Sequence, residues 1–317
     1  MMSELAISRR RQSSGSPIAA IGFTSYMGTG DLKQLDASLA EIEALGAEAA
    51  EISLFGEEVV CGGRAVRSRL AKLRDITRRR ALRYSVHGLV SGNLMDARDL
   101  ARQKAVVRAM LEVCDAIGAT MLVQHSGHLR GADPAQREQA ARRERDALAE
   151  LGDVAQRYGV RIGLENIFVT GEDEYCQSPA AVARTIRQIG HAHVCGVLDF
   201  SHAYIECTRR GLDWRREIQT LSAVAGHLHV HDSFGIPQDD RRFYRPAEAT
   251  ALGIGDLHLP LGWGDIPWPA LFADMAVAPD AMMILEIQGD RFADEQSASL
   301  ALARSLAMSC RCLEISP

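Results

Sequence analysis

The chain has 317 residues, of which 47% are hydrophobic, and its formal net charge is −5. This length and composition are typical of a globular protein with either two modest domains or one large α/β barrel, and neither needs a disulfide or a structural metal to fold. The mildly acidic charge gives no general reason to expect a nucleic-acid partner, and no run of about 18 apolar residues predicts a membrane span.

The seven cysteines are scattered and form no CxxC pair, which favours reduced thiols in a cytoplasmic enzyme. The first seventeen residues are polar and basic and lack the apolar segment of a secretion signal. We therefore interpret residues 1–17 as a flexible N-terminal tail and residues 18–317 as the folded domain.

From Pro17 onward, short apolar runs alternate with long amphipathic segments. The apolar runs predict strands at 18–25, 47–53, 82–88, 119–126, 160–166, 193–201, 226–232 and 282–288. The segments between them predict helices at about 31–45, 64–80, 96–117, 134–157, 178–189, 208–222, 267–276 and 294–313. Several of these helices carry candidate start signals, at Asp31, Asp96, Asp133-Pro134 and Ser178-Pro179.

Strands that alternate with helices indicate parallel βαβ units, and eight such units predict a single (β/α)8 TIM barrel with its active site at the C-terminal face of the strands. An open doubly wound sheet is the main alternative. It is disfavoured because no GxGxxG follows the first strand and because eight strands suit a closed barrel. Residues 233–266 form a connection that is too long to be a simple turn, so we expect an active-site loop there.

Six of the eight predicted strands end in a histidine or a carboxylate, and the barrel brings strand ends together. A lone histidine in such a position is usually a hydrogen-bonded structural residue, but a carboxylate after an apolar run is costly to bury unless a cation lies nearby. Asp, Glu and His ligands without cysteine favour Zn²⁺, Mn²⁺, Co²⁺ or Mg²⁺, and their number leaves room for more than one ion per chain. The six residues are His87, His125, Glu165, Asp199, His229 and Glu286, and His202, Asp256 and His258 lie close to them in sequence.

These residues resemble those of the xylose isomerase-like TIM-barrel superfamily, which contains sugar isomerases and epimerases and the endonuclease IV family. The resemblance runs in order over most of the chain, and the DxHxxxGxG pattern in the long connection makes it specific. The matching segments are SVHGLVSGNL (85–94), LVQHSGHL (122–129), GLEN (163–166), VLDFSHAY (197–204), HLHVHDS (227–233), DLHLPLGWGDI (256–266) and ILE (284–286).

The two branches of the superfamily imply different sites. The sugar enzymes hold one metal with four residues, which correspond to Glu165, Asp199, His229 and Glu286, and their two glutamates exchange protons with the substrate. The endonuclease IV family holds three zinc ions with nine residues. All nine have counterparts here, which are the four just named together with His87, His125, His202, Asp256 and His258.

Other features favour the sugar branch. The chain has IGFTSYM at 21–27 where endonuclease IV proteins have GxHxS, and Gly88-Leu89 replaces their Pro-Tyr pair. The loop HLPLGWGDIPW is similar to that of the sugar enzymes. DNA binding also needs many Lys and Arg contacts, which makes nucleic acid an unlikely partner for this acidic chain.

The resemblance implies a divalent-metal-dependent isomerase or epimerase of a sugar, sugar phosphate or related polyol or keto acid. Glu165 and Glu286 would transfer a proton alpha to a carbonyl through a metal-stabilised enediolate. Two alternatives stay open: a multinuclear zinc phosphoesterase acting on abasic DNA, and a metal-dependent lyase or dehydratase of a keto-inositol type substrate. A homo-oligomer is possible, although no sequence feature marks an interface.

The segment HLHVHDSFG (227–235) raises a separate question of depth, because alternate residues of a strand share one face but lie roughly 6.6 Å apart. We expect His229 at the metal and His227 one layer deeper as a hydrogen-bonded core residue. We expect His231 and Asp232 at the mouth, where they would orient a ligand or the substrate. In the long loop, Trp263 and Arg241 are further candidates for substrate contacts.

Overall fold

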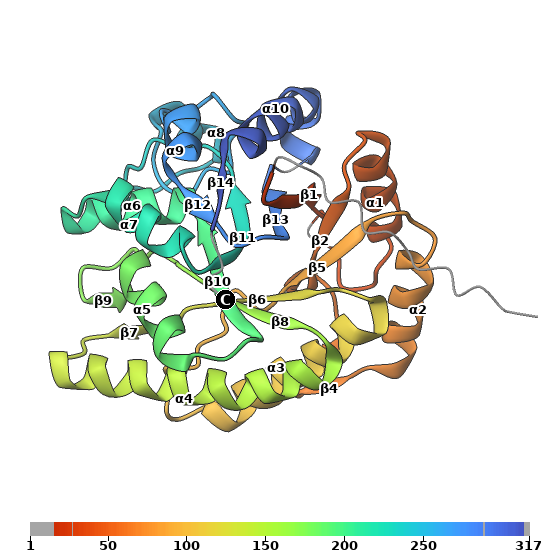
Figure 1. The fold of residues 1–317 in the computed structure, drawn as a ribbon, viewed down its shortest axis with the longest axis horizontal. Coiled ribbons are helices and arrows are strands. Elements are labelled where there is room, and N and C mark those ends of the chain that lie inside the picture. The colour runs from red at the N-terminus through yellow and green to blue at the C-terminus, as the bar shows by residue number, and fades with distance from the viewer. Residues whose placement is uncertain (1–15, 27, 288, 314–317) are drawn as a thin grey trace, which may run out of the picture.

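A computed structural model describes residues 16–26, 28–287 and 289–313. Eight parallel strands close into one barrel in the order β1, β13, β11, β10, β8, β6, β5 and β2, which confirms the predicted (β/α)8 fold (Figure 1). Their bounds are β1 Ile18–Thr24, β2 Ala49–Ser53, β5 Arg83–His87, β6 Met121–His125, β8 Arg161–Glu165, β10 Val194–Asp199, β11 Ala225–Val230 and β13 Ala281–Leu285. The predicted tail at 1–17 falls almost wholly outside the described residues.

The helices surround the strands, and the last of them, α10, packs against α9 and β1 to complete the ring (Figure 1). The helices are α1 Leu35–Ala44, α2 Arg67–Thr77, α3 Leu100–Ile117, α4 Pro134–Tyr158, α5 Pro179–Ile189, α6 Phe200–Arg210, α7 Trp214–Ser222, α8 Pro246–Leu252, α9 Trp268–Asp274 and α10 Gly289–Ser309. A short 3-10 turn, η1 Leu54–Gly56, follows β2. Three two-stranded ribbons complete the described structure: β3 Val60–Cys61 with β4 Arg64–Ala65, β7 His128–Arg130 with β9 Glu174–Cys176, and β12 Ala276–Val277 with β14 Arg311–Cys312. In the described part of the chain, no helix is long and apolar enough to cross a membrane.

Two of the four predicted helix starts are confirmed. Asp133 forms a capping box at the start of α4, and the Ser178 side chain accepts a hydrogen bond from the Ala181 amide at the start of α5. Asp31 and Asp96 instead accept hydrogen bonds from backbone amides two residues later, within turns, and the helices begin a few residues further on.

The prediction of one helix at 208–222 is wrong. Helix α6 begins at Phe200, immediately after β10, and a second helix, α7, follows. The reason is Asp199, whose side chain accepts a hydrogen bond from the His202 amide and thereby caps α6 at the last residue of the strand.

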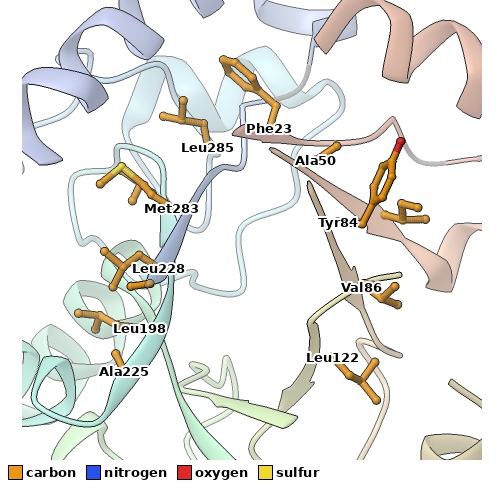
Figure 2. Packing of buried hydrophobic residues seen from close by; sticks show 14 of the residues in the cluster. Phe23, Ala50, Tyr84, Val86, Leu122, Leu198, Ala225, Leu228, Met283 and Leu285 are labelled. Atoms are coloured by element: carbon orange, nitrogen blue, oxygen red, sulfur yellow. The ribbon is translucent and has the colours of Figure 1, made fainter. Parts of the chain in front are cut away.

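The hydrophobic core has an outer layer between strands and helices. Strand residues that point outward, such as Leu198, Leu228 and Met283, belong to one large buried cluster with the helix residues. Figure 2 shows these three side chains on neighbouring strands β10, β11 and β13, directed away from the barrel interior. Because strand side chains alternate, the intervening residues of the same strands face the barrel axis.

The barrel interior is apolar at its base and polar toward its C-terminal end. Two small clusters fill the base, one of them formed by Met121, Val123, Cys195 and Val197. On β2 the inward series is Ala49, Glu51 and Ser53, so a fully buried carboxylate lies inside the barrel. Higher on the strands, the inward positions carry the histidines and carboxylates described below.

The connection after β11 contains α8 and is held by Asp232. This side chain is fully buried, and its oxygens accept hydrogen bonds from the amides of Ser233, Gly262 and Ile266 and from the Trp268 indole. The expectation that Asp232 orients a ligand is therefore wrong: four donors of the connection and of α9 occupy its oxygens.

The buried carboxyl group of Glu144 in α4 allows a test of the packing. Burial raises its pKa to about 7, and hydrogen bonds from the Gly127 amide and the Gln177 side chain oppose this shift. The folded protein therefore binds a proton that the unfolded chain releases near 4.5, so stability is lost as the pH rises from about 4.5 to 7. Glu144→Gln should remove this loss, which amounts to about 3 kcal/mol at most. Urea unfolding should show the variant gaining stability relative to the parent at pH 8 compared with pH 4.5, and an equal difference at both values would contradict the assignment.

Candidate metal centre and active site

The structure brings together, at the C-terminal end of the barrel, all nine of the histidines and carboxylates predicted for metal binding. The strand register places these residues at the same height along the barrel axis, because Asp199 pairs with His229 and His125 pairs with Glu165 across neighbouring strands. His202 enters from the first turn of α6, and Asp256 and His258 enter from the long connection. Residues that are up to 199 positions apart in the chain therefore share one site, whose first and last members are His87 and Glu286.

Glu165 lies at the centre of the group and is fully buried. Its Oε1 atom is 3.0 Å from His229 Nδ1 and 3.4 Å from His202 Nδ1. Its Oε2 atom is 3.4 Å from both His87 Nε2 and His125 Nε2. One carboxylate thus faces four imidazoles.

Burial acts against the charged form of these groups, but their mutual attraction is stronger. Desolvation alone would raise the pKa of Glu165, yet His229 and His125 hold it well below its usual range. In the same way, burial would lower the pKa of His229, but Glu286, Glu51 and Glu165 raise it well above its usual range. The site is therefore built to hold opposite charges close together.

A second part of the site is formed by Asp199, His202, His231, Asp256 and His258. Asp199 Oδ2 is 3.1 Å from His231 Nε2, and Asp256 Oδ2 is 3.4 Å from His202 Nε2 and 2.8 Å from His258 Nε2. The His231 and His258 rings stack with centroids 4.1 Å apart.

His258 is held in a costly backbone conformation. Its φ of 49° is in the left-handed region, which non-glycine residues adopt rarely, and its Nδ1 contacts the Glu286 carbonyl oxygen at 2.9 Å. Such strain is typical of functional positions, where surrounding contacts fix a side chain in place.

The donor set fits a divalent cation. Five buried polar atoms of this region have no hydrogen-bond partner among the described residues, and they include Glu165 Oε2, His229 Nε2 and His231 Nδ1. Unpaired buried polar atoms are costly, and a bound ion would satisfy some of them. Several sets of at least three ligand atoms lie within 4.8 Å of one another, among them the set from Glu165, Asp199 and His229 and the set from His231, His258 and Glu286.

A cavity of about 540 Å³ opens onto this group. Its inner wall carries Glu165, His202, Asp256 and Glu286. Its outer wall comes from the loops after the strands and contains Phe55, Val90, Ile167, Phe168 and Val169. The site therefore combines a charged base with an apolar entrance.

Two candidates from the long loop lie away from this cavity. Arg241 is half-exposed and pairs with Asp239 at 3.4 Å. Trp263 is 49% exposed and packs edge-on against Phe292. Neither residue is among those that line the cavity.

Two residues lie closer to the centre of the site than the sequence predicted. His231 is fully buried within the second part of the site rather than at its mouth. Glu51 was not predicted at all, although its inward position between Ala49 and Ser53 could have been read from the strand period of two. His227 lies one layer deeper and bonds through Nε2 to Glu51 Oε2 at 2.9 Å, which confirms its predicted role as a hydrogen-bonded core residue.

Comparison with known protein families gives a direct result. The model of the xylose isomerase-like TIM barrel family matches residues 39–308. The chain belongs to this family. No curated protein matches the chain.

Among solved structures, a D-tagatose 3-epimerase-like protein has 17% identity and a TM-score of 0.64, and the match covers 90% of this chain and 96% of that one. The 3-keto-D-glucoside 4-epimerase of E. coli in its apo form has 16% identity and a TM-score of 0.61 over 90% and 98% of the two chains. A Thermus thermophilus protein soaked with ZnCl2 has 21% identity and a TM-score of 0.61 over 92% and 99%. At these identities, the likeness concerns the fold.

The donor set leads to a prediction for metal removal and return. Protein stripped with a chelator should gain thermal stability when Mn²⁺, Zn²⁺ or Co²⁺ is added, because the ion binds the folded state only. At a free ion concentration of 100 Kd the gain is about 2.7 kcal/mol, or several degrees in Tm. Differential scanning calorimetry measures the gain, and Glu165→Gln should reduce it. A parent protein with the same Tm at every metal concentration would contradict a metal centre.

Proposed function

We propose that the protein is a divalent-metal-dependent sugar isomerase or epimerase. One observation carries the proposal: Glu165, the last residue of β8, and Glu286, the first residue after β13, line the same cavity and both approach His229 Nδ1, at 3.0 and 3.5 Å. The sugar epimerases among the structural neighbours support this choice of reaction.

Proton transfer alpha to a carbonyl needs a base on the carbon and a means of stabilising the negative charge that develops. A bound divalent ion would supply a Lewis acid for this charge, and Glu165, Asp199, His229 and Glu286 would hold it. Neighbouring imidazoles hold the pKa of Glu165 well below its usual range, so it is ionised at neutral pH, although the same shift weakens it as a base.

Glu286, carrying a proton of its own, would deliver it either to the opposite face of the same carbon in an epimerase or to the neighbouring carbon in an isomerase, while Glu165 keeps the proton it removed until solvent exchange restores both groups. His202 lines the cavity beside the carboxylates of Glu165 and Asp256 and can hydrogen-bond a substrate hydroxyl. Phe168, which lies with its ring 5.1 Å from that of His202, covers the apolar face of a bound sugar and limits the access of water.

Glu165→Gln and Glu286→Gln should each lower proton exchange into a substrate ketose by roughly 10²–10⁴-fold, because each removes one of the two groups that transfer the proton. Incubation of the metal-loaded protein with a panel of ketoses in D2O, followed by NMR, measures the exchange. Glu144→Gln is the matched control, since it alters a buried carboxylate that does not line the cavity. Absence of deuterium from every ketose would count against the mechanism, and so would full activity of Glu286→Gln.

The cavity also indicates the charge of the substrate, which the sequence left open. The described residues that line it include no lysine and no arginine, whereas Glu174, Asp256 and Glu286 are present. Histidines at the base of the cavity, such as His87, His202 and His258, already face carboxylates, so a phosphate would find no lysine or arginine free to pair with it. We infer an uncharged, hydroxyl-rich ketone as the substrate.

For a matched pair of a free ketose and its phosphate ester, the free sugar should have the higher kcat/KM by tenfold or more, which is about 1.4 kcal/mol in transition-state binding. Steady-state kinetics on the metal-loaded protein measures the ratio. Arg241→Ala should leave KM for the free sugar unchanged, because Arg241 lies outside the cavity. Faster turnover of the phosphate ester would contradict the inference.

A second candidate is a multinuclear phosphoesterase, which the convergence of all nine predicted ligands favours. The second part of the site, with Asp256 and His258, gives room for more than one ion. Metal analysis that finds two or three ions per chain, together with nicking of abasic-site DNA that Glu165→Gln abolishes, would establish this activity instead. A lyase would share the first proton-transfer step and would be recognised by loss of a leaving group from the substrate.

A further inference from the structure

The inference concerns Glu51 and rests on the proposed function, because it assigns this residue a role toward the metal. Glu51 is fully buried in the barrel interior. One of its carboxylate oxygens, Oε2, accepts hydrogen bonds from Ser85 Oγ at 2.8 Å and from His227 Nε2 at 2.9 Å. The other oxygen, Oε1, has no aligned hydrogen-bond donor and lies 3.0 Å from His229 Nε2.

The two nitrogens of the His229 ring therefore face different carboxylates. Nδ1 faces Glu165 and Glu286, which line the cavity, whereas Nε2 faces Glu51, which lies in the interior of the barrel. A neutral imidazole carries a proton on one nitrogen and a lone pair on the other, and only the lone pair can bind a metal. Whatever accepts the proton at Nε2 thus determines whether Nδ1 is available.

We propose that Glu51 is the positioning residue of the metal centre: its Oε1 accepts the Nε2 proton of His229 and leaves the Nδ1 lone pair for a divalent cation held with Glu165 and Glu286. Ser85 and His227 fix the carboxylate by occupying its other oxygen. A ligating histidine commonly donates its second N–H to a carboxylate in this way, and the loss of such a partner weakens metal binding.

A different role for Glu51, as a ligand of the ion itself, fits the contacts less well. Its Oε2 already accepts from two donors, and its Oε1 lies on the side of the His229 ring opposite to Glu165. Glu51 is also absent from the residues that line the cavity. An oxygen of Glu51 nevertheless lies within 4.8 Å of ligand atoms from His87, His229 and Glu286, so the experiment below includes a ligand role as an outcome.

The test is Glu51→Gln in the full-length protein. This change keeps the size of the side chain but replaces one carboxylate oxygen by an NH2 group and removes the negative charge. The dissociation constant for Zn²⁺ or Mn²⁺, measured by competition with a chelating dye, should rise by about 10–100-fold. Glu144→Gln is the matched control. It changes another buried carboxylate that neither contacts His229 nor lines the cavity, so its affinity should stay within about threefold of the parent.

Three results would overturn the proposal. A folded Glu51→Gln protein, judged by circular dichroism, that binds metal as tightly as the parent would show that Glu51 only fills the interior. If Glu51→Gln does not fold, Glu51→Asp keeps the charge but withdraws it from His229, and unchanged affinity in that variant has the same meaning. A visible spectrum of bound Co²⁺ that differs strongly between Glu51→Gln and the parent would make Glu51 a ligand. Failure of the parent to bind any metal is a separate outcome, since it would overturn the proposed function itself.

Discussion

The central constraint on this structure is the burial of charge at one end of a barrel. Carboxylates and imidazoles that would each be costly to bury alone lie 2.8 to 3.4 Å from one another, so that each offsets the desolvation of its neighbours. The arrangement depends on the barrel, because only a closed parallel sheet brings the ends of β5, β6, β8, β10, β11 and β13 to a common rim. Stability and chemistry therefore use the same groups.

The buried histidines and carboxylates extend from the cavity toward the interior of the barrel. Glu165 and Glu286 meet the cavity, His229 lies between them and Glu51, and His227 and Ser85 support Glu51 from the same interior layer. This vertical order differs from the usual apolar filling of a barrel interior. It would fix the orientation of the His229 ring, and a metal ligand that is already oriented binds an ion without further ordering of its side chain.

The barrel and most of the ligand positions could be predicted from the sequence, because strand period and strand-end polarity are local signals. The inward position of Glu51 could be predicted from the strand period, but its partner could not, since His229 is 178 positions away in the sequence. Helix α6 was missed for a related reason: Asp199 is at once the last residue of a strand and the cap of a helix, and the apolar run 193–201 concealed the boundary. His231 and Asp232 were assigned to the mouth because the fold of the long connection, which covers them, is not encoded in any periodic pattern.

The direct passage from β10 into α6 also has a consequence for how this scaffold can be altered. The chain has no loop between Asp199 and Phe200, so insertions at that point would break the cap of the helix and displace His202 from the site. The outer wall of the cavity instead comes from the segments after β2, β5 and β8, which carry Phe55, Val90 and residues 167–170. Directed evolution toward a new substrate should therefore diversify those three segments and leave the junction at Asp199 unchanged.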